Sequence, residues 1–124
     1  MTLTTKLLVA ASLAAIVAPV LAAGDAGAGR ALYQARCMAC HSIDYNGVGP
    51  AHRGVFGRAA AQAPGFAYSE ALKSARVIWN EDTLDRWLAD PEKVAPGQRM
   101  GVNVPEAKDR ADLIAYLKQA AAAK

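Results

Sequence analysis

The sequence predicts an all-α fold of about four to five helices joined by long loops. Three observations support this class. Apolar residues recur at helical spacing in several segments, N-capping residue types precede those segments, and no segment makes a convincing strand. The chain has 124 residues, 53% of them hydrophobic and 20% charged, and shows no internal repeat, so it has room for one small domain.

The N-terminal segment is expected to lie outside that domain. After Lys6 comes an apolar run of 17 residues that ends at Ala23, shorter than the ~20 residues of a membrane-spanning helix. Compact residues then offer a cut after Ala22 or Ala23. We expect residues 1–22 to be a cleaved secretory signal peptide and residues 23–124 to be a periplasmic domain without stable membrane insertion. A membrane anchor is the alternative.

Two helices are expected in the first half of the mature chain. The first would run from Ala26 to about residue 40, with Asp25 as its N-cap. Gly29 within it would let another backbone approach closely. The second would be short, with Ser69 as its N-cap and an end near Ala75.

Two further helices are expected in the second half. Asn80 would cap one that carries acidic residues in its first turn and that Pro91 stops. The last would begin near Glu106 and reach almost to the end of the chain. Its alanine-rich tail, residues 120–123, is expected to fray.

A long loop separates the first two helices. From Ser42 to Ala67 there is little periodicity and several turn dipeptides, such as Asn46-Gly47 and Pro64-Gly65. A loop of more than 20 residues is unusual in a compact domain. It is reasonable where the loop wraps a large flat ligand that itself forms the core.

The segment Cys37-Met38-Ala39-Cys40-His41 indicates such a ligand. The pattern C-x-x-C-H is typical of covalent haem c attachment. Two thiols one helical turn apart can add to the two vinyl groups on one edge of a porphyrin. The imidazole that follows can then bind the iron.

Three other kinds of site share parts of this motif. A thioredoxin-like redox pair would need a βαβ pattern around it, and none is visible. A structural zinc site would need Cys37, Cys40, His41 and His52 together, but the adjacency of the first histidine to a cysteine would strain that arrangement. A plain disulfide would leave His41 without a role.

A second axial ligand is expected from Met100. It lies in a loop that Pro96 and Gly97 can orient, and a thioether raises the reduction potential relative to a second imidazole. Met38 lies inside the attachment motif and cannot reach the opposite face. His52 remains the alternative ligand, although it follows the motif histidine by only 11 residues, a short reach around a ring.

The mature chain resembles class I c-type cytochromes, the family of mitochondrial cytochrome c and its small bacterial relatives, and therefore a small cytochrome c fold. The likeness covers nearly everything from Gly29 to Leu117. Besides C-x-x-C-H, it is carried by Gly49-Pro50, Gly54 to Arg58, Gln62 to Tyr68, Trp79, Thr83-Leu84, Pro91, Pro96 to Met100, and Asp112 to Leu117.

The resemblance implies roles for residues around the haem. The carbonyl of Pro50 would accept a hydrogen bond from the motif imidazole. Arg58, Tyr68 and Trp79 would hold the buried haem propionate, since a carboxylate inside a protein needs an opposite charge and donors. Trp87 stands where relatives commonly place a tyrosine that hydrogen-bonds the methionine sulfur.

The chain also departs from the family pattern. His52 replaces an apolar residue that usually packs beside the haem, and Gly101 to Val104 replaces a longer phenylalanine-containing segment. The resemblance further implies that Gly29 and Tyr33 cross against Leu113 and Tyr116, where the terminal helices meet.

The expected function is one-electron transport. A monomer with one covalent haem would shuttle electrons in a respiratory or related chain. Its partners would be redox proteins, with a cytochrome bc complex or dehydrogenase as donor and a terminal oxidase as acceptor. The sequence pI near 9.0 is weak evidence for nucleic acid, because two propionates would bring the holoprotein near neutral. No catalytic constellation stands out, so no enzyme is expected. A haem enzyme or ligand sensor with a displaceable sixth ligand is the alternative.

Overall fold

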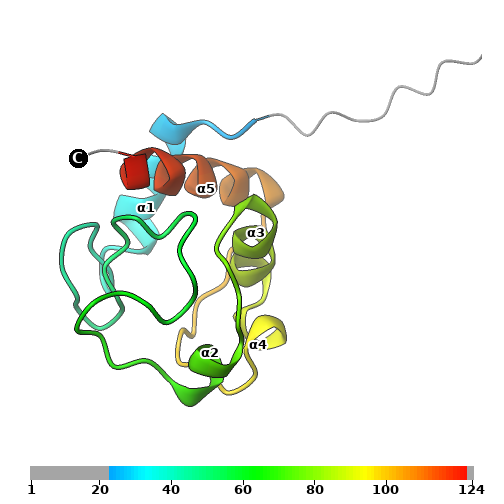
Figure 1. Cartoon of the computed structure of the whole chain (residues 1–124). Helices are drawn as coiled ribbons and strands as arrows, with labels where there is room; N and C mark the ends of the chain where they lie inside the picture. Colours follow the sequence, from blue (N-terminus) through cyan, green and yellow to red (C-terminus); the bar gives the residue numbers. More distant parts are fainter. Residues whose placement is uncertain (1–22, 123–124) are drawn as a thin grey trace, which may run out of the picture.

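The computed structural model describes residues 23–122, and within them every regular element is a helix (Figure 1). The elements are α1 (Ala26–Arg36), α2 (Glu70–Ser74), α3 (Glu81–Ala89), α4 (Pro91–Val94) and α5 (Ala107–Ala122). In that part of the chain the pairing of extended backbone is limited to one isolated bridge, between Ala59 and Ile78. The expected all-α class is confirmed. The expected signal peptide, residues 1–22, lies outside the described residues.

The two terminal helices cross closely, with α5 lying across α1 in Figure 1. At the crossing, a Cβ atom added to Gly29 would lie 1.9 Å from the carbonyl oxygen of Asp112. The rings of Tyr33 and Tyr116 pack beside it, with centroids 5.3 Å apart. Leu113 is 1% exposed in the same cluster. The expected crossing is therefore present, and a glycine is what permits it.

The N-caps are those that the sequence indicates. The Asp25 side chain accepts from the backbone N–H of Gly27 at 2.7 Å, and that of Ser69 accepts from Leu72 at 3.2 Å. Asn80 forms a reciprocal capping box at the start of α3. Each side chain satisfies a backbone donor that has no partner inside its own helix.

The first helix ends earlier than expected, at Arg36 rather than near residue 40. The carbonyl of Tyr33 accepts from both Cys37 N, at 2.9 Å, and Met38 N, at 3.2 Å. The chain then tightens into turns, in which Cys40 N and His41 N both donate to the Cys37 carbonyl. The attachment motif therefore lies in a turn that follows the helix.

The expected stop at Pro91 is confirmed, since α3 ends at Ala89. Pro91 also begins α4, a short helix that was not expected, where its missing N–H costs nothing at the first helical position. Asp90 caps this short helix by accepting from Lys93 N at 3.3 Å. At the other end, the expected fraying is wrong for residues 120–122, and residue 123 lies outside the described residues. Ala120 is 9% exposed, and α5 continues to Ala122.

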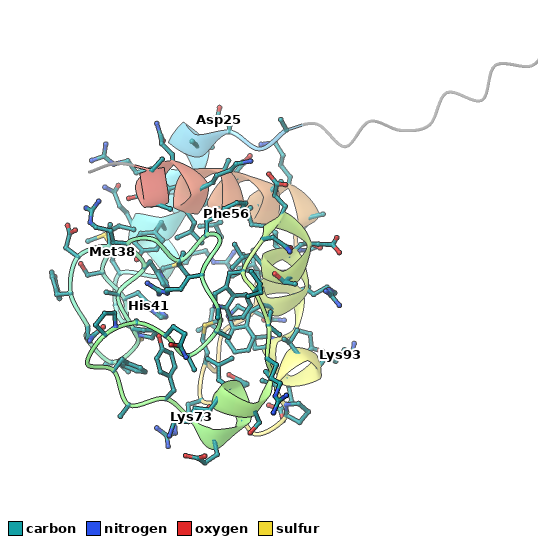
Figure 2. All side chains as sticks on the ribbon, in the orientation of Figure 1. Asp25, Met38, His41, Phe56, Lys73 and Lys93 are labelled. Atoms are coloured by element: carbon teal, nitrogen blue, oxygen red, sulfur yellow. The ribbon has the colours of Figure 1, made fainter. Side chains whose placement is uncertain are left out.

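The loops and helices enclose a central space. The chain from residue 37 to 69 winds along one side, and α3 and α4 lie on the other (Figure 1). In Figure 2 the labelled His41 lies among the side chains inside the loops, whereas Lys73 and Lys93 lie at the periphery. None of the helices in the described range is long and apolar enough to cross a membrane.

Candidate functional site: a haem pocket

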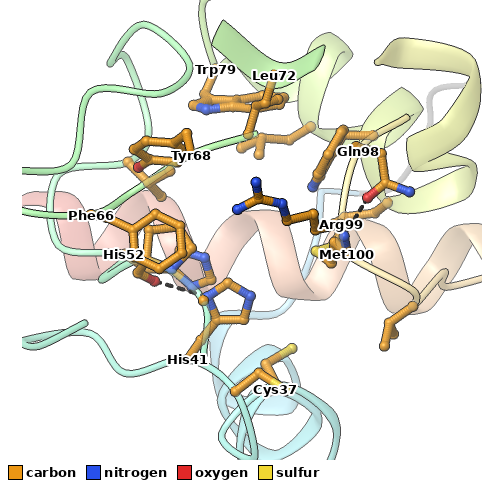
Figure 3. Close-up of a pocket in the computed structure, with 18 of the residues that line it drawn as sticks. Cys37, His41, His52, Phe66, Tyr68, Leu72, Trp79, Gln98, Arg99 and Met100 are labelled. Atoms are coloured by element: carbon orange, nitrogen blue, oxygen red, sulfur yellow. Dashed lines mark hydrogen bonds between the residues drawn. The ribbon is translucent and has the colours of Figure 1, made fainter. Parts of the chain in front are cut away.

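One cavity of about 430 Å³ lies between the long loop, α1 and the α3–α5 side of the molecule (Figure 3). This volume is within the ~300–1,000 Å³ typical of ligand pockets. The structure brings all nine predicted cofactor-binding residues to its wall: Cys37, Cys40, His41, Pro50, Arg58, Tyr68, Trp79, Trp87 and Met100.

The two cysteines lie at one edge of the cavity. Cys37 is half-buried and Cys40 exposed, and they are not joined by a disulfide. Burial raises the pKa of the Cys37 thiol, partly opposed by the neighbouring Arg36. Both sulfurs are therefore free for thioether bonds to a group inside the cavity.

The imidazole of His41 is fixed from three directions. Its Nδ1 hydrogen-bonds the carbonyl oxygen of Pro50 at 2.8 Å, so Nδ1 carries the proton and donates. A Cβ atom on Gly49 would come within 2.3 Å of its Cε1. On another side lies the ring of His52, stacked at 4.1 Å between centroids and 21° between planes. Burial lowers the pKa of His41, which keeps the ring neutral and leaves the Nε2 lone pair available as a metal ligand.

His52 lies beside His41, on the same side of the cavity (Figure 3). Its Nδ1 is 3.0 Å from the hydroxyl oxygen of Tyr33. Burial, together with the nearby His41 and Arg58, lowers the pKa of His52 to about 3. The ring is therefore neutral at physiological pH. Two imidazoles in face-to-face contact leave no room for an ion between them.

Met100 reaches the cavity from a different segment, the loop after α4 (Figure 3). It is half-buried and packs at the border of the hydrophobic core. Trp87 lines the same cavity, and its ring centroid lies 5.5 Å from that of Trp79. Within residues 23–122 no hydrogen bond joins the Trp87 indole to Met100.

Arg58 is one of the arginines on the cavity wall. Its Nη1 donates to the Arg53 carbonyl at 3.0 Å and its Nη2 to the Ala51 carbonyl at 3.3 Å. The third donor, Nε, is buried and has no partner in the described part of the chain. A buried donor without a partner costs free energy, so we expect Nε to donate to an acceptor on a ligand bound in the cavity.

Tyr68 and Trp79 complete this polar end. Tyr68 is 9% exposed, and its hydroxyl oxygen accepts from Ala63 N at 3.0 Å, so its own proton is free to be donated. Trp79 is held beside Arg58 by a backbone bond from Trp79 N to the Arg58 carbonyl, 2.9 Å long. Arg58 and Trp79 approach each other because the chain pairs here at the isolated bridge, and Tyr68 lines the same cavity.

Sequence reasoning missed other wall residues. Gln98 and Arg99 come from the loop before Met100, and Phe66 and Leu72 from the long loop and α2. Gln98, Arg99 and Phe66 belong to stretches that carry the family resemblance, but none of them was assigned a role of its own. Nothing in the sequence singled them out, because only the folded chain brings their side chains to the cavity.

The residues present fit a haem. The cavity combines two free thiols, a neutral imidazole with one nitrogen available, a thioether and an unpaired buried guanidinium donor. The remaining wall is largely apolar. Such a set suits a large apolar macrocycle that binds iron and ends in a carboxylate.

Comparisons with known proteins agree with this chemistry. The cytochrome c family profile matches residues 26–121. Cytochrome c of Chlamydomonas reinhardtii is 46% identical over 106 residues, covering 81% of this chain and 93% of the relative. The cytochrome c-type cyt cy of Rhodobacter capsulatus is 47% identical over 103 residues, covering 82% of this chain but 52% of that longer protein.

Among solved structures, cytochrome cH from Methylobacterium extorquens superposes with a TM-score of 0.75 at 45% identity. The superposed region covers 77% of this chain and 99% of the cytochrome cH chain. The profile match over most of the described residues, these relatives and the C-x-x-C-H cavity together identify the protein. The chain belongs to the cytochrome c family and is a haem-containing electron carrier, not an enzyme, whose haem c is covalently attached.

Proposed function

We propose that this cytochrome is an exported one-electron carrier whose single haem is attached through Cys37 and Cys40 and ligated by His41 and Met100. The observation that carries the proposal is the convergence of these four side chains on one cavity from two distant segments. Bound there, the haem supplies a reversible one-electron iron couple. The protein supplies the axial ligands, the apolar surroundings and the compensation of the propionate charge.

The proximal role of His41 is supported by its hydrogen bond to Pro50. A ligating histidine is oriented by the bond that its other nitrogen makes. Here Nδ1 of His41 lies 2.8 Å from the carbonyl oxygen of Pro50 and donates to it, which leaves Nε2 as the ligating atom. The Gly49 backbone restricts ring movement, because even one added carbon would collide with the imidazole.

Met100 is a better distal ligand than His52 for two reasons. The ring of His52 stacks on that of His41, so the two imidazoles would not bind one iron from opposite faces. Its Nδ1 is also engaged with the Tyr33 hydroxyl. A His/Met ligand pair raises the reduction potential, as suits a carrier in a respiratory or related chain.

Arg58, Tyr68 and Trp79 are proposed to hold one propionate. The unpaired Nε of Arg58 and the free proton of Tyr68 are donors that a carboxylate would satisfy. Trp87 is proposed to pack against the bound haem from the α3 side.

The decisive experiment compares the visible and near-infrared spectra of three oxidised holoproteins: the unmodified protein, Met100→Ala and His52→Ala. Sulfur–iron ligation gives a weak near-infrared band, which Met100→Ala should abolish while His52→Ala leaves it in place. Met100→Ala should also admit carbon monoxide to the reduced iron. If His52→Ala opens the iron and Met100→Ala does not, bis-histidine ligation is correct. If the unmodified protein binds carbon monoxide rapidly, Met100 is not firmly bound to the iron and the proposed His/Met ligation fails.

The partners and compartment are part of the same proposal. The carrier would work as a monomer in the periplasm. It would accept electrons from a cytochrome bc complex or a dehydrogenase and deliver them to a terminal oxidase. Export rests on the apolar segment before residue 23. The intact mass of native protein tests it, because a chain that retains Met1 in a membrane fraction would show an anchor instead.

A further inference from the structure

The segment that carries Met100 leaves α4 through a tight turn. Over residues 95–98 the Gln98 N–H donates to the Ala95 carbonyl at 3.0 Å. Pro96 is the second residue of the turn and Gly97 the third, with φ at +88°. These are the features of a type II turn, in which glycine is favoured at the third position. The turn directs the chain toward the cavity but ends two residues before Met100.

Beyond the turn the backbone has little support. Within the described chain, residues 99–103 make a single hydrogen bond, from Met100 N to the side-chain oxygen Oε1 of Gln98 at 2.5 Å. The next anchor is Val104 N, which donates to the Leu88 carbonyl at 2.7 Å. Val102, between them, is 46% exposed. One side chain thus holds the backbone of Met100.

That side chain is itself held by Glu92 of α4. The Glu92 carboxylate accepts from the backbone N–H of Gly97 at 2.7 Å and from the Gln98 amide nitrogen Nε2 at 3.2 Å. Figure 3 shows the Gln98 side chain beside the Met100 backbone, with the hydrogen bond between them. A continuous bridge therefore runs from α4 through Glu92 and Gln98 to Met100.

The bridge has a fixed polarity. A carboxylate only accepts and a backbone N–H only donates, so the Gln98 amide must point its NH₂ at Glu92 and its oxygen at Met100. A hydrogen bond to a charged acceptor is stronger than one between neutral groups. The charge on Glu92 therefore orients the amide that restrains Met100.

We propose that Glu92 and Gln98 are positioning residues that keep the Met100 sulfur on the iron. The inference rests on the proposed ligation by Met100. Without the bridge, residues 99–103 would have no hydrogen bond to the rest of the protein, and the thioether would leave the iron more often. The pair then determines how readily an external ligand enters the distal position.

The test is imidazole binding to the oxidised holoprotein, since imidazole must displace Met100 to bind. Gln98→Ala removes the bridge and should raise the apparent affinity about 10-fold, the effect of losing roughly one or two hydrogen bonds. Gln98→Glu should also raise it, because two carboxylates then face each other. Glu92→Gln should raise the imidazole affinity too, because an amide at position 92 that accepts from Gly97 N would turn its own NH₂ group toward the NH₂ group of Gln98.

The double variant Glu92→Gln with Gln98→Glu is the critical case. The new amide would accept from Gly97 N and donate to the new carboxylate, which would still accept from Met100 N. All three bonds are restored, and only the bond between residues 92 and 98 has its direction reversed, so imidazole affinity should return to within about twofold of the unmodified protein. A merely destabilising pair of changes would not show this rescue.

Glu81→Gln is the matched control, because Glu81 is likewise an exposed acid in the first turn of a helix but lies on α3, paired with Lys118. It should leave imidazole affinity unchanged. If Gln98→Ala also leaves it unchanged while Met100→Ala abolishes the near-infrared band, the positioning role is wrong and the ligation stands. If Met100→Ala does not affect that band, the ligation proposal itself fails.

Discussion

At the scale of single residues, Arg58 is proposed to link the fold to its cofactor. Two of its guanidinium nitrogens donate to carbonyls of the long loop, which fixes the group, and the third is buried without a partner. A fixed donor inside an apolar cavity favours a bound carboxylate over water. Under the proposed role, the residue would tie the conformation of residues 51–58 to the presence of a propionate.

Arg58→Ala tests this link. Removing one partner of a buried charge pair costs roughly 3–5 kcal/mol, so the free energy of unfolding of the holoprotein should fall by about that amount. The reduction potential should shift as well, because the propionate charge would lose its compensation. Chemical denaturation and a redox titration measure the two effects.

Lys73→Ala is the control for Arg58→Ala. Lys73 pairs with Glu70 at 2.8 Å, but both side chains are largely exposed, and such surface pairs contribute only about 0–1 kcal/mol. An Arg58→Ala protein that kept both its stability and its potential would show that the guanidinium does not contact the propionate.

At the scale of elements, the crossing of α1 and α5 depends on the absence of one side chain. A Cβ atom at Gly29 would lie 1.9 Å from the Asp112 carbonyl oxygen and 3.0 Å from Tyr116 Cβ. The Asp112 carbonyl belongs to the backbone of α5, which cannot move aside for a Cβ atom as the end of a flexible side chain can. The helices would have to separate, and the packing around Leu113 would loosen.

Gly29→Ala should therefore destabilise the holoprotein by about 1–3 kcal/mol or more, although alanine is the better helix former. Urea denaturation measures the change. Gly27→Ala is the matched variant in the same helix: its Cβ would meet only the Asp25 carboxylate oxygen, at 3.1 Å. Equal effects of the two changes would show that helix propensity, not close approach, governs this site.

The same crossing carries a buried acid, Asp112. Its side chain accepts from Asp25 N at 2.7 Å and from the Lys108 ammonium, and it is 4% exposed. The hydrogen bond from Lys108, and to a smaller extent that from Asp25 N, lowers the pKa of Asp112 below its ordinary value of 3.8. A carboxyl with a lowered pKa stabilises the fold above the unfolded-state pKa and loses that contribution as pH falls through the folded-state value.

Asp112→Asn should accordingly be less stable than the parent protein at neutral pH, and the difference should shrink as pH falls below 3.8. Denaturation curves of both proteins from neutral to acid pH measure it. Asp82→Asn, a change at an exposed position of α3, serves as the comparison. A stability difference independent of pH would mean that the substitution acts through packing and not through the charge.

At the scale of the whole molecule, the haem is expected to fill a central space that the apolar side chains leave open. The cavity of about 430 Å³ lies among Trp79, Leu84, Trp87 and Leu113, which are nearly fully buried. A chain of this size buries too little apolar surface to tolerate such a space easily. The covalently attached haem stays on the chain when it unfolds, and folding buries the apolar surface of the haem in this space.

Cys37→Ser combined with Cys40→Ser should consequently give little stable protein, and whatever accumulates should release its haem. Acidified-acetone extraction separates the cases: colour stays with the parent protein and leaves with the solvent for the variant. The mass of the parent should exceed that of its mature chain by one haem. Colour that leaves the parent protein would contradict covalent attachment.

The sequence by itself determined the features that depend on neighbours in the chain. C-x-x-C-H is a local pattern, so it identifies the attachment chemistry before any fold is known. Asp25, Ser69 and Asn80 cap backbone donors within three residues, so their helices were predictable. The family resemblance then supplied Pro50, Arg58, Tyr68 and Trp79, which spacing alone does not connect.

Only the tertiary structure decided what depends on residues distant in sequence. The stacking of His52 on His41 and the burial of Ala120 follow from packing between segments that no local pattern relates. The Glu92–Gln98–Met100 bridge needs the turn at Pro96 to bring α4 against its own exit loop. A hydrogen bond between side chains is selected by three-dimensional proximity, and in this protein proximity is decided by how the chain encloses its haem.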